Sequence, residues 1–288
     1  MKNKIGSFFL ILLIPVIYFA SMTIAQIFVM IVAMIFSQAI GIKYDFMEYN
    51  LLMFICTIGM IVGIIVTIVY YKPVFKVKLK TALLEKQNVN IFMVLLSLVI
   101  GVSCGYFASS LPVLLFPNGK PAENPVTDGF SIMTIITVAI LAPIFEELVF
   151  RKFMLDAAKQ RGLSVILISI LTACLFALSH DPTSIIYLLA TFIMGLTFAF
   201  SYHKSGVILY CILMHFANNA MACISTYIEF NSNTPVIEAE IVETSLLYDI
   251  LFTVICFVIF AASLFLFCKL AKKQRNKSNL TSKNNIEL

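Results

Sequence analysis

The chain has 288 residues, of which 61% are apolar and only 12% are charged. The apolar residues fall in repeated runs of about the twenty residues that a helix needs to cross a bilayer. This composition excludes an ordinary water-soluble domain. The formal net charge of +5 is explained by membrane topology and attraction to anionic lipid, so it requires no nucleic-acid partner.

The apolar runs and the charged breaks between them predict an all-α fold, a polytopic membrane helical bundle of about eight transmembrane helices. No polar segment is long enough to form a separate soluble domain. The predicted spans are residues 8–36, 51–71, 90–116, 130–150, 163–180, 183–202, 206–226 and 246–268.

The distribution of basic residues predicts the orientation, because Lys and Arg accumulate in cytoplasmic loops. With eight spans and both termini in the cytoplasm, 18 of the 20 basic residues lie on the inner side, and only Lys43 and Lys120 lie outside. The sequence therefore predicts a multi-pass protein of the cell membrane with both ends in the cytoplasm.

Three regions follow along the chain. Residues 1–129 form a three-span N-terminal region without a buried charge, and residues 130–228 hold every candidate for chemistry. Residues 229–288 comprise an acidic external loop, the last span and a basic cytoplasmic tail.

Two GxxxG patterns lie within the first region, at Gly59 and Gly63 and at Gly101 and Gly105. Glycines four apart line one helix face and let a neighbouring backbone approach closely. We expect them to serve helix packing, and they are weak evidence for a dimer.

Glu146 and Glu147 lie near the end of an apolar run, where an ionisable side chain is costly unless it is paired or functional. Glu147 and Arg151 are four residues apart, on one helix face, and can form a charge-assisted pair. Glu146 points about 100° away, which leaves it the less restrained carboxylate and suits it to general acid–base chemistry. The alternative is an acid–base cluster that anchors the helix at the cytoplasmic boundary.

Two of the three histidines, His180 and His215, also lie in or at the end of apolar runs. Phe176 precedes His180 by four residues, and Asn219 follows His215 by four, so each pair shares a helix face. A single intramembrane histidine is more often a packing residue, but two of them alongside a glutamate pair indicate proton-transfer chemistry or a metal site.

Zinc is the competing chemistry, because Glu146, His180 and His215 would form a His₂Glu ligand set with a water in the open position. The HExxH signature of zinc proteases is absent from the sequence. Asn219 suits hydrogen bonding better than zinc ligation, so we expect no metal cofactor.

In their order and spacing, EExxxR at Glu146–Arg151, FxxxH at Phe176–His180 and HxxxN at His215–Asn219 resemble the CPBP family. This family comprises the CAAX proteases and bacteriocin-processing enzymes and is also called the Abi family. The resemblance covers about a third of the chain, and all three motifs match without a departure.

The resemblance implies an intramembrane endopeptidase of the glutamate type that acts on membrane-associated peptides or protein tails. It implies that Glu146, assisted by His180, activates a water, and that His215 and Asn219 stabilise the oxyanion. Glu147 and Arg151 would hold the first motif in place, and Phe176 would pack beside the site. The implied roles are pheromone or bacteriocin maturation or self-immunity to a bacteriocin. The alternative is a non-catalytic immunity or partner protein in the membrane.

Overall fold

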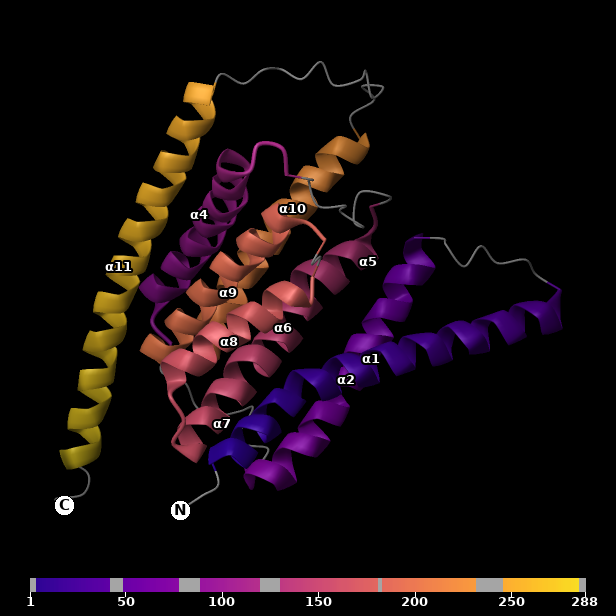
Figure 1. Ribbon diagram of the computed structural model, residues 1–288, viewed down its shortest axis with the longest axis horizontal. Helices are drawn as coiled ribbons and strands as arrows, with labels where there is room; N and C mark the ends of the chain where they lie inside the picture. Colours follow the sequence, from indigo (N-terminus) through magenta and orange to yellow (C-terminus); the bar gives the residue numbers. More distant parts are fainter. Residues whose placement is uncertain are drawn as a thin grey trace. The chain divides into compact units, whose positions relative to one another are not determined.

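The structure is a computed structural model that describes residues 4–41, 49–77, 89–119, 130–180, 183–231 and 246–284. Within these ranges the regular secondary structure is entirely helical, which confirms the predicted all-α fold (Figure 1). The helices are α1 (Lys4–Ile40), α2 (Tyr49–Phe75), α4 (Ile91–Leu115), α8 (Val165–Leu178), α9 (Ile185–Ser205), α10 (Ile208–Asn231) and α11 (Leu246–Asn284), together with a composite helix over residues 132–161.

The composite helix consists of five consecutive segments: α5 (Ile132–Thr134), η1 (Ile135–Leu141), α6 (Ala142–Glu147), η2 (Leu148–Phe153) and α7 (Met154–Arg161). The η segments are π-helical. Gly162 ends the composite helix with a φ of 67°, a left-handed conformation that favours glycine at this position.

Seven helices of the described residues are long and apolar enough to cross a membrane. They match seven of the eight predicted spans. The remaining predicted span, 163–180, corresponds to α8, which has only 14 residues. At 1.5 Å per residue α8 is about 21 Å long, less than the hydrocarbon core of about 30 Å.

The chain divides into two compact units, and some helices contribute to both. The first unit contains Met1–Lys86, Asn124–Ile168 and Asn219–Asn233, and the second contains Gln87–Glu123, Ser169–Asn218 and Thr234–Leu288.

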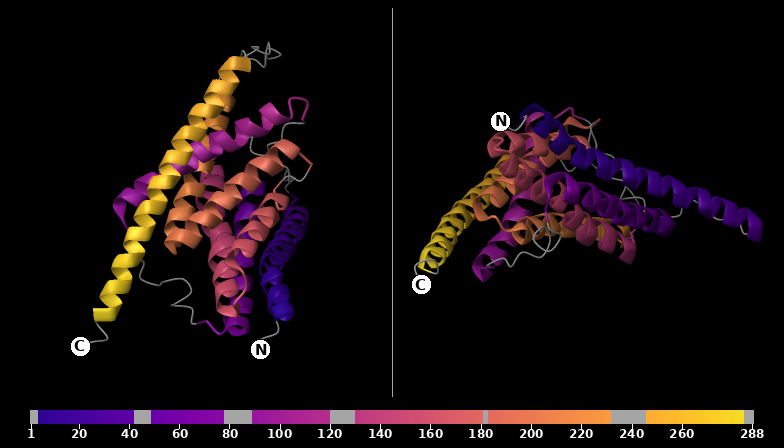
Figure 2. Two further views of the ribbon diagram at one scale, coloured as in Figure 1. Left: turned by 60° about the vertical axis from the view of Figure 1, so that its left-hand side comes forward. Right: turned by 90° about the horizontal axis from the view of Figure 1, so that it is seen from below.

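In the first unit α1 and α2 lie along one another, and both contact the composite helix (Figure 2). The glycines of the first GxxxG pattern face α1. A Cβ added to Gly59 would lie 2.6 Å from the Gln26 side chain, and one added to Gly63 would lie 3.0 Å from the Tyr18 carbonyl oxygen. The pattern therefore serves helix packing within the chain, as predicted.

In the second unit α4 lies beside both α9 and α11 (Figure 1). The second GxxxG pattern faces α10. A Cβ added to Gly101 would overlap the Met214 carbonyl, and one added to Gly105 would overlap the Asn218 side-chain oxygen. Both predicted glycine patterns thus let helices of the same chain approach closely.

Candidate active site

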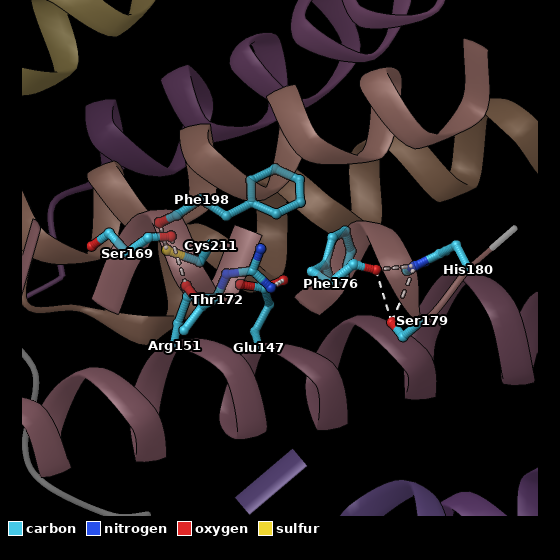
Figure 3. A network of polar contacts seen from close by, with 9 residues as sticks. All are labelled: Glu147, Arg151, Ser169, Thr172, Phe176, Ser179, His180, Phe198 and Cys211. Atoms are coloured by element: carbon cyan, nitrogen blue, oxygen red, sulfur yellow. Dashed lines mark hydrogen bonds and ion pairs between the residues drawn. The ribbon is translucent and has the colours of Figure 1, made fainter. Parts of the chain in front are cut away.

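The ion pair predicted from the spacing of Glu147 and Arg151 is present (Figure 3). Arg151 Nη1 donates to Glu147 Oε1 at 2.9 Å, and both side chains are 0% exposed. The Arg151 guanidinium also lies over the Phe150 ring, 5.7 Å from its centre. Two complementary charges are therefore held inside the first unit.

The neighbouring Glu146 is half-buried, whereas Glu147 is fully buried. Glu146 is thus the more accessible of the two carboxylates, in line with the distinction drawn from the Arg151 spacing.

Two π-helical segments flank the turn that carries both glutamates. The segment η1 precedes α6 and η2 follows it. Segments of π-helix are rare and are frequently found at functional sites. The periodicity of the apolar residues did not reveal them.

A proline accounts for a carbonyl group that the first π segment leaves without a helical partner. The Ala142 N–H donates to the carbonyl of Thr137, five residues back. In the same pattern Val138 would accept from residue 143, but this residue is Pro143 and has no N–H. Asn219 Nδ2 donates to the Val138 carbonyl at 2.9 Å instead.

The bond to Val138 fixes the Asn219 amide against the helix that carries Glu146. The Asn219 side chain is half-buried, and its NH₂ group has two donors, of which this bond uses one. The sequence signal for this contact, which our sequence analysis missed, was a proline three residues before the first glutamate.

His180 follows α8 and is half-buried. Its Nδ1 donates to the Phe176 carbonyl at 2.7 Å, and Ser179 Oγ donates to the same carbonyl at 2.8 Å (Figure 3). A carbonyl can only accept, so this bond fixes the tautomer with the proton on Nδ1. The neutral ring then presents Nε2 as a proton acceptor.

The Phe176 ring contacts both histidines of the second unit. Its ring centre lies 4.5 Å from that of His180 and 5.6 Å from that of His215, which it meets edge to face. His215 is 4% exposed and stacks on Phe198 at 5.3 Å on another side. The sequence analysis did not single out Phe198, which has no motif to mark it.

The predicted site residues thus form two groups, each within one unit. Glu146, Glu147 and Arg151 share the composite helix, against which Asn219 is bonded. His180, Phe176 and His215 form the second group. His215 and Asn219 lie four residues apart on α10.

Among the described side chains, no group of three or more His, Cys, Asp and Glu residues is placed to hold a metal ion. His180 Nε2 could still serve as a single ligand in its observed tautomer. The roles proposed below use protein side chains and water.

Residues 128–221, about a third of the chain, match the model of the family described as type II CAAX prenyl endopeptidase Rce1-like. This range contains all three motifs.

Two curated proteins are similar to the chain. One is the "Putative membrane peptidase YdiL" of Bacillus subtilis (strain 168), 24% identical over 172 residues, which are 58% of this chain and 69% of that protein. The other is the "Uncharacterized 24.3 kDa protein" of Escherichia coli, 31% identical over 110 residues, which are 38% of this chain and 50% of that protein. No solved structure matches the chain.

The family model covers the helix of the two glutamates, both histidines and Asn219. The similarity to a protein named as a membrane peptidase agrees with it. Residues 128–221 are therefore similar to the Rce1-like type II CAAX prenyl endopeptidases, and the chain is similar to a protein named as a membrane peptidase.

Proposed function

We propose that the chain is an endopeptidase of the glutamate type that hydrolyses membrane-associated peptides or protein tails. The observation that carries this proposal is that two adjacent glutamates of one helical turn differ in burial and in ion pairing. Glu147 is neutralised by Arg151 at 2.9 Å and fully buried, whereas the adjacent Glu146 remains accessible. Glu147 is thus fixed in an ion pair, and we assign the proton transfer to Glu146, the less buried of the two carboxylates.

In the proposed reaction Glu146 takes one proton from a water, assisted by His180, whose Nε2 can accept a hydrogen bond. The oxygen of that water attacks the carbonyl carbon of the scissile bond, and the carbonyl electron pair moves onto its oxygen. His215 and Asn219 donate hydrogen bonds to this oxyanion. Glu146 then returns its proton to the leaving nitrogen as the C–N bond breaks.

The remaining motif residues hold these groups in position. Phe176 packs against both histidine rings and restricts their rotation. The Glu147–Arg151 pair fixes the helical turn next to Glu146. The Val138 carbonyl orients the amide of Asn219. Preorganised donors of this kind need little rearrangement when charge develops in the transition state.

The substrate is expected in the bilayer or at its surface, because two of the three helices that carry the motifs are themselves apolar spans. We propose a role in maturing a peptide pheromone or a bacteriocin, or in self-immunity to a bacteriocin. Resemblance to the CPBP family supports this role. For the orientation, we propose that both termini lie in the cytoplasm, as the basic residues favour.

The test is the hydrolysis of membrane-anchored peptides by the purified full-length protein in proteoliposomes. Glu146→Gln removes the proton acceptor and keeps the size of the side chain, so we expect the rate to fall by about 10²–10⁴. Asp156→Asn is a matched control, because it neutralises another acid of the composite helix, paired with Lys152 at 2.9 Å. We expect it to keep the wild-type rate.

A non-catalytic immunity or partner protein predicts a different result. In that case Glu146→Gln would preserve the cellular phenotype, and neither the wild-type protein nor the variant would cleave the peptides. Equal rates of hydrolysis in wild type and Glu146→Gln would contradict the role of Glu146 as the base.

A further inference from the structure

Helix α2 is hydrogen-bonded to the composite helix at both of its ends. At the first residue of α2, Thr134 Oγ1 donates to Tyr49 Oη at 2.7 Å. At the last residue, Gln160 Nε2 donates to the Phe75 carbonyl at 2.7 Å. Side-chain hydrogen bonds of this kind join membrane helices, between which lipid leaves little hydrophobic attraction. Together they hold α2 in one register along the composite helix.

A further bond between the same two helices reaches the first π segment. The hydroxyl oxygens of Thr57, on α2, and Thr137, in η1, lie 2.7 Å apart. Thr57 Oγ1 donates its one hydrogen to the Met53 carbonyl at 2.9 Å. The hydrogen between the helices therefore belongs to Thr137, which is 4% exposed. This bond ties η1 to a fixed point on α2.

The tied residue directly precedes the carbonyl that orients Asn219. The Val138 carbonyl accepts from Asn219 Nδ2 at 2.9 Å, and its partner in the π pattern would be Pro143, which has no N–H. No bond along the helix therefore sets the direction of this carbonyl. If η1 turns about its axis at Thr137, the Val138 carbonyl and the amide bonded to it turn as well.

We propose that Thr57 is a positioning residue for Asn219, the oxyanion donor. The inference rests on the proposed function. The Thr57 hydroxyl fixes Thr137, and this fixes the rotation of η1. The Val138 carbonyl then aims the Asn219 amide at the oxyanion. All four residues belong to the first unit.

The proposal gives the N-terminal region a part in catalysis. Thr57 lies outside residues 128–221, which match the family model, and outside the three motifs. Apolar contact has no preferred direction, whereas a hydrogen bond does. A threonine pair at this level of the two helices thus restricts a rotation that apolar side chains would permit.

The test measures kcat and KM of Thr57→Val, using the full-length protein in proteoliposomes and a membrane-anchored peptide. Valine keeps the branched shape and removes the hydroxyl. Complete loss of one oxyanion donor costs about 10²–10³ in rate, so we expect misdirecting it to lower kcat by about 10-fold. KM should stay the same, because the donor acts on charge that develops only in the transition state.

Two further variants connect this effect to the hydroxyl bond itself. Thr57→Ser keeps a hydroxyl on α2 and should have nearly the wild-type kcat. Thr137→Val removes the same bond from the other helix and should lower kcat as Thr57→Val does. The melting temperature shows that each variant is folded.

Thr67→Val is the matched control. Thr67 lies on the same helix, is 0% exposed and donates to the Gly63 carbonyl at 2.7 Å, four residues back, as Thr57 does to Met53. The substitution therefore removes a buried hydroxyl and a bond within α2. We expect its kcat to equal that of wild type.

A double variant shows whether Thr57 acts through Asn219. If it does, Thr57→Val lowers kcat in the wild-type protein and has no further effect in Asn219→Ala, because the donor that it directs is absent. A merely structural role would lower kcat by the same factor in both backgrounds.

A wild-type kcat in Thr57→Val or Thr137→Val would overturn the inference. Equal losses in the two Asn219 backgrounds would do so too, as would a Thr57→Ser variant as slow as Thr57→Val. Glu146→Gln in the same assay separates the two proposals. If Glu146→Gln is inactive while Thr57→Val keeps the wild-type kcat, the proposed function stands and the positioning role fails. If Glu146→Gln keeps the wild-type rate, the proposed function itself fails.

Discussion

Removing Arg151 should destabilise the protein strongly, because it leaves the Glu147 carboxylate buried without its counter-charge. The two charged atoms lie 2.9 Å apart, and both side chains are 0% exposed. At this distance the attraction is about 6 kcal/mol for an effective dielectric constant of about 20. The cost of desolvating two ions is of similar size, so the intact pair contributes little net stability. Arg151→Ala removes the attraction and leaves the Glu147 carboxylate desolvated without compensation, and we expect it to cost about 3–5 kcal/mol.

The double variant separates pairing from packing. Glu147→Leu combined with Arg151→Met replaces both charges by apolar side chains of similar length. Such replacements of a buried pair are often neutral or stabilising, so we expect the double variant to be more stable than Arg151→Ala. Thermal unfolding in detergent and accumulation in the membrane measure the difference.

A neighbouring pair on the same helix provides the control. Lys152 Nζ lies 2.9 Å from Asp156 Oδ2, but the Asp156 side chain is 30% exposed and Lys159 lies nearby at 3.9 Å. Lys152→Ala should therefore cost less than Arg151→Ala. The reasoning would be refuted if Arg151→Ala unfolded at the wild-type temperature, or if the double variant were less stable than the single one.

Two further predictions concern the metal and the topology. If the mechanism is metal-free, the purified protein should contain no stoichiometric zinc and should keep its activity in strong chelators. Asn219→Ala should then lower the rate of hydrolysis by about 10²–10³, because one oxyanion donor is lost. Loss of activity in a chelator, its recovery on adding zinc, and near-normal turnover in Asn219→Ala would favour the zinc mechanism. Reporter fusions at Arg161 and Lys273 should report the cytoplasm and a fusion at Gly119 the exterior. A fusion at Lys204 should also report the cytoplasm if α8 crosses the membrane, and an external signal there would contradict the eight-span topology.

Features that depend on neighbours along one helix were predictable from the sequence. The Glu147–Arg151 pair and the proximity of Phe176 and His180 follow from a spacing of four residues, because side chains one turn apart share a face. The long apolar runs predicted the helices for the same reason, since hydrophobicity over about twenty residues determines insertion into a bilayer.

Features that depend on distant residues were not predictable. The contact between Phe176 and His215 joins two helices, and the bond from Asn219 to Val138 spans 81 residues. The π segments replace the bonding pattern of an α-helix without changing the apolar character of the sequence.

The short length of α8 affects how the polar groups at its end are satisfied. The helix begins at Val165, shortly after Lys159 and Arg161, whose charges remain near a membrane surface. Its 14 residues then end about 9 Å short of the opposite surface. Carbonyl groups at a helix end cannot remain unsatisfied in hydrocarbon, so they require protein donors or water. Protein donors are present at this end of α8: the Phe176 carbonyl accepts from His180 Nδ1 at 2.7 Å, and the Ala177 carbonyl accepts from the His180 N–H at 3.2 Å. The bond that fixes the tautomer of His180 therefore also caps the helix, so the short end of α8 and the orientation of this imidazole depend on each other.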